Sequence, residues 1–301
     1  MVGTLTAAFL SALLAQAPAD ARQGRAPQTD QTVPAARGTR LVVDNTAGEV
    51  VVHAWDKESV RVQARHSARA KVNVRAGTNT ITVDAESVNG HAGSVDYDIT
   101  APSWMPIKIE GQYDFVSVEG IQGELSIETV RGDIVLKNVG SAMVKTIEGG
   151  IQVDGARGKL TVSSVNEDIK ITGASGDISA DTTNGGVTMT RMESASVEIA
   201  TVNGDVVYEG TLADRGHYSF TNHNGDIELA VPENANATFT VRTYNGEFSP
   251  SVPVKGPDPS QVRRGKRVSY TLGNGSADVE LESFDGEIKL RRAEASRPRR
   301  D

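Results

Sequence analysis

The sequence predicts an all-β protein. Its larger part is a parallel β-solenoid (β-helix) of about eight coils of 17–21 residues, preceded by a β-rich N-terminal cap. The first supporting observation is a pattern that recurs between Gly123 and Leu290: alternating apolar residues, a Ser or Thr, a turn residue and Gly. The second is that Asn most often precedes the turn Gly. The third is that no stretch shows the periodicity of an amphipathic helix. Self-similarity of this length is typical of stacked repeats.

The first apolar residue after each turn marks the register of the coils. These residues are 17, 18, 18, 19, 21, 21 and 40 positions apart, and they are Ile134, Ile151, Ile169, Val187, Val206, Ile227, Phe248 and Ile288. Because strands of successive coils pair in parallel about 4.8 Å apart, these side chains are expected to stack. One coil buries too little apolar surface to offset the entropy of ordering it, so stability has to come from stacking. A two-sheet and a three-sided cross-section both fit the pattern.

The N-terminal segment predicts export. Residues 1–21 contain an apolar run that ends at Leu14, followed by small residues, as in a secretory signal peptide. The run is too short to predict a membrane span, and we expect no transmembrane segment in the mature chain. Residues 22–38, rich in Pro, Gln, Thr and Ala, predict a disordered linker. The expected location is therefore the periplasm or the cell surface.

The remaining boundaries follow from changes in pattern. Residues 39–121 alternate with period two but lack the repeat length, which predicts a strand cap that covers an open solenoid edge. Residues 122–292 form the predicted solenoid domain, interrupted from Pro250 to Ser276 by an insertion that we expect to protrude as a loop or hairpin. Residues 293–301 are a basic tail, which we expect to be disordered.

The turns carry a set of glycines to which we assign a structural role, because Asn-Gly pairs readily adopt left-handed backbone angles. They are Gly132, Gly149, Gly185, Gly204, Gly225, Gly246 and Gly286. Asn residues at one height on successive coils are expected to form a hydrogen-bonded ladder, as is the column of Ser and Thr residues before the turn.

Composition argues against several classes of function. The net charge of −8 comes from interspersed charges with no basic face, so we predict no nucleic-acid partner. The absence of Cys excludes disulfides and thiolate metal sites. Acidic residues recur beside the turns, but calcium-binding β-rolls supply several ligands per ion and here each turn supplies one. The five histidines, at 53, 66, 91, 217 and 223, share no spacing. We therefore predict neither a metal site nor a cofactor.

Catalysis would require carboxylates, or a carboxylate and a base, that converge on one face. The outward columns instead alternate in charge, so we predict no catalytic residues. The alternative is a polysaccharide lyase or hydrolase, in which Lys145 and Asp181 would be the residues to test. Arg131-Gly132-Asp133 spells a tripeptide that some adhesion receptors bind, but the turn pattern already accounts for its Gly and Asp.

One column of apolar residues follows the Ser/Thr column directly. If the Ser/Thr side chains point inward, strand alternation turns this column outward and creates a binding stripe; if the backbone bends there, the column belongs to the core. We favour the core slightly. The candidate stripe residues are Val130, Ile147, Val165, Val202, Tyr244 and Phe284, with Thr183 and His223 at the same position.

The chain resembles the bacterial β-strand-repeat family whose members are called putative adhesins, a domain of unknown function. The resemblance covers about residues 39–292. It rests on Val43-Asp44-Asn45 followed by Gly48-Glu49-Val50, on residues 98–102, and on the repeated Gly-Asp-Ile turns. It implies an exported β-solenoid without catalytic residues.

We therefore predict a secreted, adhesin-like binding or structural element of the bacterial cell envelope, with a protein or glycan ligand. A periplasmic partner or regulator of an envelope signalling system is a further alternative.

Overall fold

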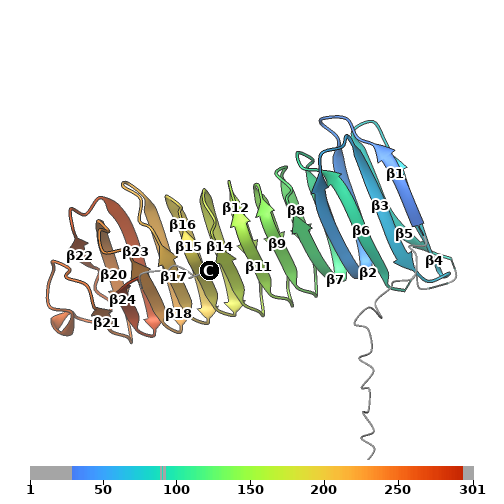
Figure 1. The fold of residues 1–301 in the computed structure, drawn as a ribbon. Helices are drawn as coiled ribbons and strands as arrows, with labels where there is room; N and C mark the ends of the chain where they lie inside the picture. Colours follow the sequence, from blue (N-terminus) through green and yellow to red (C-terminus); the bar gives the residue numbers. More distant parts are fainter. Residues whose placement is uncertain (1–28, 89, 91–92, 294–301) are drawn as a thin grey trace, which may run out of the picture.

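The computed structural model describes residues 29–88, 90 and 93–293. These residues form an elongated stack in which strands pile up as rungs and two sheets face each other across a narrow apolar core (Figure 1). The prediction of an all-β solenoid is confirmed. Within the described residues, no helix has the length and hydropathy needed to cross a membrane.

Six rungs follow one another directly along the chain. Each consists of two short strands: β8 (Leu125–Glu128) and β9 (Ile134–Val139), β10 (Ala142–Lys145) and β11 (Ile151–Ala156), β12 (Leu160–Ser163) and β13 (Ile169–Thr172), β14 (Asp177–Asn184) and β15 (Val187–Met192), β16 (Ser196–Asn203) and β17 (Val206–Gly210), β18 (His217–Asn224) and β19 (Ile227–Val231). The predicted register is confirmed, because Ile169 pairs with Val187 and Val187 pairs with Val206.

The pairings also establish the cross-section. First strands of successive rungs pair in parallel with one another, and second strands do the same, so the stack has two sheets rather than three. Every second side chain points inward, as Leu160 and Val162 do in β12. The opposite bend is also packed, since Val139, Ala156, Ala174 and Met192 are buried.

Two further rungs lie inside the N-terminal region that the sequence analysis treated as a cap. The long strands β2 (Arg40–Trp55) and β7 (Ile107–Glu119) pair in parallel, and each contributes to both sheets. β7 then pairs with β8 and β9. On the far side of β2, β6 (Val95–Pro102) and β3 (Ser59–His66) extend one sheet, while β5 (Thr80–Ser87) and β4 (Ala70–Ala76) extend the other.

The predicted linker is wrong for part of its length. β1 (Thr29–Pro34) pairs antiparallel with β3 and forms the outer edge of one sheet. The polar composition of this segment gave no signal of a strand. As an edge strand it is held by main-chain hydrogen bonds, and an ion pair between Asp30 and Arg61 supplements them. The predicted signal peptide, residues 22–28 of the linker and residues 294–301 of the tail lie outside the described residues.

The order of the last rungs differs from their order in the sequence. The strands β23 (Ala277–Asp285) and β24 (Ile288–Arg292) pair directly with β18 and β19. The earlier strands β20 (Ala237–Thr243) and β21 (Phe248–Pro250) lie outside them. Ile288 is therefore stacked between Ile227 and Phe248. The insertion holds a short 3-10 turn (Pro259–Gln261) and β22 (Val268–Leu272), which pairs antiparallel with β20 at the edge of the stack.

Candidate binding surface

The Ser/Thr column points inward at the bend between the two sheets. Its buried members are Thr129, Thr146, Ser164, Thr182, Thr201, Asn222 and Ser283. The predicted ladder within this column is wrong: its side chains from Ser164 onward donate to carbonyl groups of the turns, and Thr129 and Thr146 have no hydrogen-bond partner among the described residues. Thr201 Oγ1 donates to the carbonyl oxygen of Gly185 at 3.0 Å, and Asn222 Nδ2 donates to that of Gly204 at 2.7 Å.

The predicted asparagine ladder is present. Asn184 Nδ2 donates to Asn166 Oδ1 at 3.0 Å, Asn203 to Asn184 at 2.9 Å, and Asn224 to Asn203 at 2.8 Å. The two inner amides, Asn184 and Asn203, each donate to one neighbour and accept from the other, so the ladder runs along the turn edge of four rungs.

The turn glycines are required chiefly by the close approach of successive rungs. A Cβ at Gly149 would overlap the carbonyl oxygen of Gly132, and a Cβ at Gly204 would overlap that of Gly185. Gly132, Gly225 and Gly286 have positive φ angles, as the turn chemistry predicts, but Gly149 and Gly204 do not. Left-handed backbone angles therefore account for only some of these glycines, and the close approach of the neighbouring rung accounts for the others.

The acidic residues beside the turns connect one rung to the next. Asp133 Oδ1 accepts a hydrogen bond from the backbone N–H of Gly150 at 2.8 Å, and Asp168 accepts one from Gly186 at 2.8 Å. In the last rungs, the Lys289 ammonium and the backbone N–H of Glu287 hold the pKa of Asp226 below its usual range. No group of three His, Asp or Glu side chains that could hold a metal ion occurs among the described residues.

The column after the Ser/Thr residues faces solvent, and our preference for the core was wrong. Val130, Ile147, Val165, Val202 and Phe284 are 36–46% exposed, and Tyr244 is half-buried. In β14, β16 and β18 the strand continues through this position, so alternation turns the residue after the inward Ser, Thr or Asn outward. In the first three rungs the strand ends before the Ser/Thr residue, and Val130, Ile147 and Val165 are exposed at the bend itself. With Thr183 and His223, these residues form a continuous line along eight rungs, which we call the apolar stripe.

The stripe changes character along its length. Its first half is aliphatic, whereas its last three rungs carry aromatic rings. The His223 and Phe284 rings stack with centroids 4.6 Å apart, and Tyr244 lies 5.3 Å from Phe284. The Arg242 guanidinium covers Tyr244 at 4.6 Å. Sequence reasoning could not bring these rings together, because the exchanged order of the last rungs places Phe284 between the other two.

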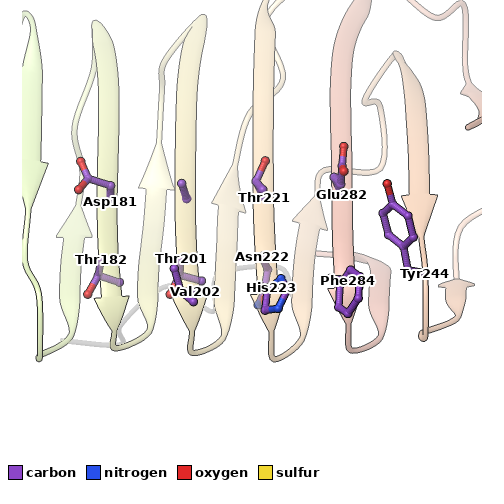
Figure 2. A pocket seen from close by; sticks show the side chains of 11 residues that line it. Asp181, Thr182, Thr201, Val202, Thr221, Asn222, His223, Tyr244, Glu282 and Phe284 are labelled. Carbon is purple, nitrogen blue, oxygen red and sulfur yellow. The ribbon is translucent and has the colours of Figure 1, made fainter. Parts of the chain in front are cut away.

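A shallow groove of about 580 Å³ follows the aromatic half of the stripe. Figure 2 shows its two rows: Asp181, Thr221 and Glu282 on one side, and Val202, His223 and Phe284 on the other, with Tyr244 at one end. Ala200 lies between Asp181 and Thr221 in the first row, and its small side chain leaves a gap in that row. The groove therefore offers apolar and aromatic surface beside a row of hydrogen-bonding groups.

The outward-facing residues beside the stripe form a column of their own. Most of them are charged, and we call this the charge column. In spatial order its members are Glu110, Glu128, Lys145, Ser163, Asp181, Ala200, Thr221, Glu282 and Arg242. Lys145 and Asp181, which the enzyme alternative would use, lie on strands separated by β12, about 10 Å apart. Asp181 instead accepts a hydrogen bond from Ser163 Oγ at 2.7 Å.

The Arg131-Gly132-Asp133 tripeptide is engaged within the fold. Arg131 pairs with Glu148 and lies over the Tyr113 ring, while Asp133 bonds to the next rung. His53, His66, His217 and His223 lie in different parts of the stack, and His91 lies outside the described residues.

The family described as Toastrack DUF4097 matches residues 39–291 of the chain. A solved structure from Clostridium sporogenes, called a putative cell adhesion protein, is 10% identical, has a TM-score of 0.25, and the match covers 88% of this chain and 99% of that one. A putative adhesin from Parabacteroides merdae is 10% identical with a TM-score of 0.41, over 87% of this chain and 95% of that one. Another from Parabacteroides distasonis is 9% identical with a TM-score of 0.45, over 87% and 96%. No curated protein matches the chain.

Proposed function

Because this chain belongs to the Toastrack DUF4097 family, we propose that it is an exported, non-catalytic, adhesin-like binding element of the bacterial cell envelope. The observation that carries this proposal is the apolar stripe. Exposed apolar residues scattered singly need no explanation, but six apolar or aromatic residues aligned in one column of eight rungs mark an interaction surface.

The construction of the stack supports a binding role. Stacked rungs hold side chains of one column at a fixed spacing of about 4.8 Å, so a ligand meets a rigid row rather than a mobile loop. The hydrogen bonds of the Ser/Thr column, the asparagine ladder and the turn acids all fix the bend from which the stripe projects. A preorganised surface binds with little loss of conformational entropy.

Export is the second part of the proposal, and it rests on the sequence of residues 1–21. An apolar leader followed by small residues directs secretion, and a chain without Cys needs no oxidative folding after export. Tagging the chain and separating cytoplasm, periplasm and outer surface tests this part. Recovery in the cytoplasm alone would overturn it.

Binding is tested by measuring retention of the purified chain on immobilised bacterial envelopes. We expect saturable retention that is lost in Val165→Glu, because a carboxylate within the stripe opposes desolvation. Val88→Glu is the matched control: Val88 is the same residue type, also exposed, and lies outside the stripe. Equal retention of both variants would overturn the assignment of the stripe, and cleavage of a polysaccharide panel at an enzyme-like rate would favour the enzyme alternative.

A further inference from the structure

The charge column has an order that relates its two ends. Counted from Glu128 to Arg242 it spans eight rungs, with Glu128 and Lys145 at one end and Glu282 and Arg242 at the other. The four central residues carry a single charge, that of Asp181. If a second copy of the column is laid against the first in the opposite direction, each terminal charge faces a charge of opposite sign. Glu128 then faces Arg242, and Lys145 faces Glu282.

The same relation extends one rung beyond each end. Glu110 precedes Glu128 in the column, and Arg267 adjoins Arg242 at the outer edge, immediately before β22. Reversal brings Glu110 opposite Arg267. Three pairs of opposite sign and no pair of like sign result, whereas most arrangements of these residues would give at least one repulsive pair.

The apolar stripe is complementary under the same reversal. Its aliphatic residues Val130, Ile147 and Val165 then face Tyr244, Phe284 and His223 respectively. Large flat rings are thus placed on smaller side chains, instead of rings on rings. A two-fold axis lying across the stripe produces both correspondences, and such an axis relates two identical copies in an isologous dimer.

We propose that the apolar stripe and the charge column form an antiparallel interface between two copies of this chain. The inference rests on the proposed binding role of the stripe and names its partner. The contact is about 35 Å long and one or two side chains wide, which places it among small, weak interfaces. We expect a dissociation constant on the order of 10–100 µM, which becomes effective when many copies are held on one surface.

Sedimentation of the full chain between about 5 and 500 µM tests the proposal, with charge reversal as the decisive step. In a two-fold dimer Arg242→Glu creates two Glu–Glu contacts, and Glu128→Arg creates two Arg–Arg contacts. Each single change is expected to weaken dimerisation at least ~10-fold, and the double variant should recover it to within ~3-fold. Lys170→Glu, on the outer face of the opposite sheet, is the control and should have no effect.

A chain that stays monomeric at the highest concentration would overturn the proposal, as would failure of the double variant to recover. Retention on envelopes separates the two proposals. If the chain is monomeric and Val165→Glu still abolishes retention on envelopes, the proposed binding role stands and only the self-interface is overturned. If the chain dimerises, Val165→Glu weakens the dimer and no retention on envelopes is seen, the adhesin-like role is overturned and the self-interface stands.

Discussion

Asn45 donates a hydrogen bond through Nδ2 to Oδ1 of Asp114 at 2.8 Å, inside the bend shared by the first two rungs. Asp114 is 0% exposed and occupies the position that a glycine holds in most later turns. Its Oδ2 lies where a Cβ of Gly111 would be, and it has no hydrogen-bond partner. The carboxyl group therefore fills the place that the Ser/Thr side chain takes in the later rungs.

This arrangement makes folding depend on pH. Burial raises the pKa of Asp114 to about 7, against the smaller opposing effects of hydrogen bonds from Gln112 and Asn45. The folded state thus binds the proton more tightly than the unfolded state, whose carboxyl has its ordinary value near 3.8. The stability contributed by this group is greatest below pH 4, decreases as the pH rises towards 7, and is constant above that.

We expect Asp114→Asn to remove this dependence, because an amide keeps the acceptor for Asn45 without a buried charge. The variant should gain about 2–3 kcal/mol more, relative to the wild type, at pH 8 than at pH 5. Urea unfolding at the two pH values measures the difference. An equal effect at both would show that the carboxyl group is ionised and solvated in the folded state, with a pKa close to its ordinary value.

Adjacent glycines in one turn give a matched test of rung spacing. Gly149→Ala should destabilise the chain by about 3 kcal/mol, because its Cβ would overlap the backbone of Gly132. Gly150→Ala should change stability by less than about 1 kcal/mol, because its Cβ would make only ordinary contacts, the nearest being Asp133 Oδ1 at 3.6 Å. Thermal unfolding of the two variants provides the comparison, and similar losses would contradict the close stacking of the turns.

The asparagine ladder predicts that the cost of a substitution depends on position. Asn203 bonds to both Asn184 and Asn224, whereas Asn166 bonds only to Asn184. We expect Asn203→Ala to cost about 1–2 kcal/mol and Asn166→Ala about half as much, because the ladder is solvent-exposed and each bond contributes modestly. Denaturant unfolding distinguishes the two. A larger loss at Asn166 would mean that the ladder does not act as a row of bonds.

The parts of the fold that the sequence predicted are those set by local alternation repeated at constant length. Ile169, Val187 and Val206 stack as expected because each rung between them has the same strand pattern and turn. The rungs formed by β2 and β7 were not predicted, because about 50 residues that form other strands separate β2 from β7 in the chain. Asp114 was not predicted because its turn departs from the repeat: a buried carboxyl group there takes the place of both the hydroxyl and the glycine of the later rungs.

For the binding surface, the sequence predicted which residues share a column but not whether they face solvent. The residues of the apolar stripe were identified from their position, but whether they point outward depends on where the backbone bends. They point outward both where the strand continues through the position, as at Val202, and where the backbone bends there, as at Val165, and the sequence contains no signal that separates a bend that exposes this residue from one that buries it. The 40-residue interval before Ile288 was one sequence signal of the exchanged order of the last rungs. The length of an interval does not, however, predict which strands pair.

The exchanged order of the last rungs can be tested by cross-linking, because the chain contains no Cys. Thr221 pairs with Glu282 on the adjacent strand, and Arg242 lies one strand further out. Neighbouring strands bring Cα atoms to about 5 Å, within the range of a disulfide, whereas two strands away the separation is about 10 Å. The double variant Thr221→Cys/Glu282→Cys should therefore form an intramolecular disulfide under mild oxidation.

The matched variant Thr221→Cys/Arg242→Cys should remain reduced, although its two positions are closer in sequence. Mass spectrometry of the oxidised proteins after proteolysis identifies the linked peptides. A stack that followed sequence order would give the opposite result, since β20 would then lie beside β18. Such a result would also separate Phe284 from His223, and with it remove the aromatic half of the apolar stripe on which both the groove and the proposed interface depend.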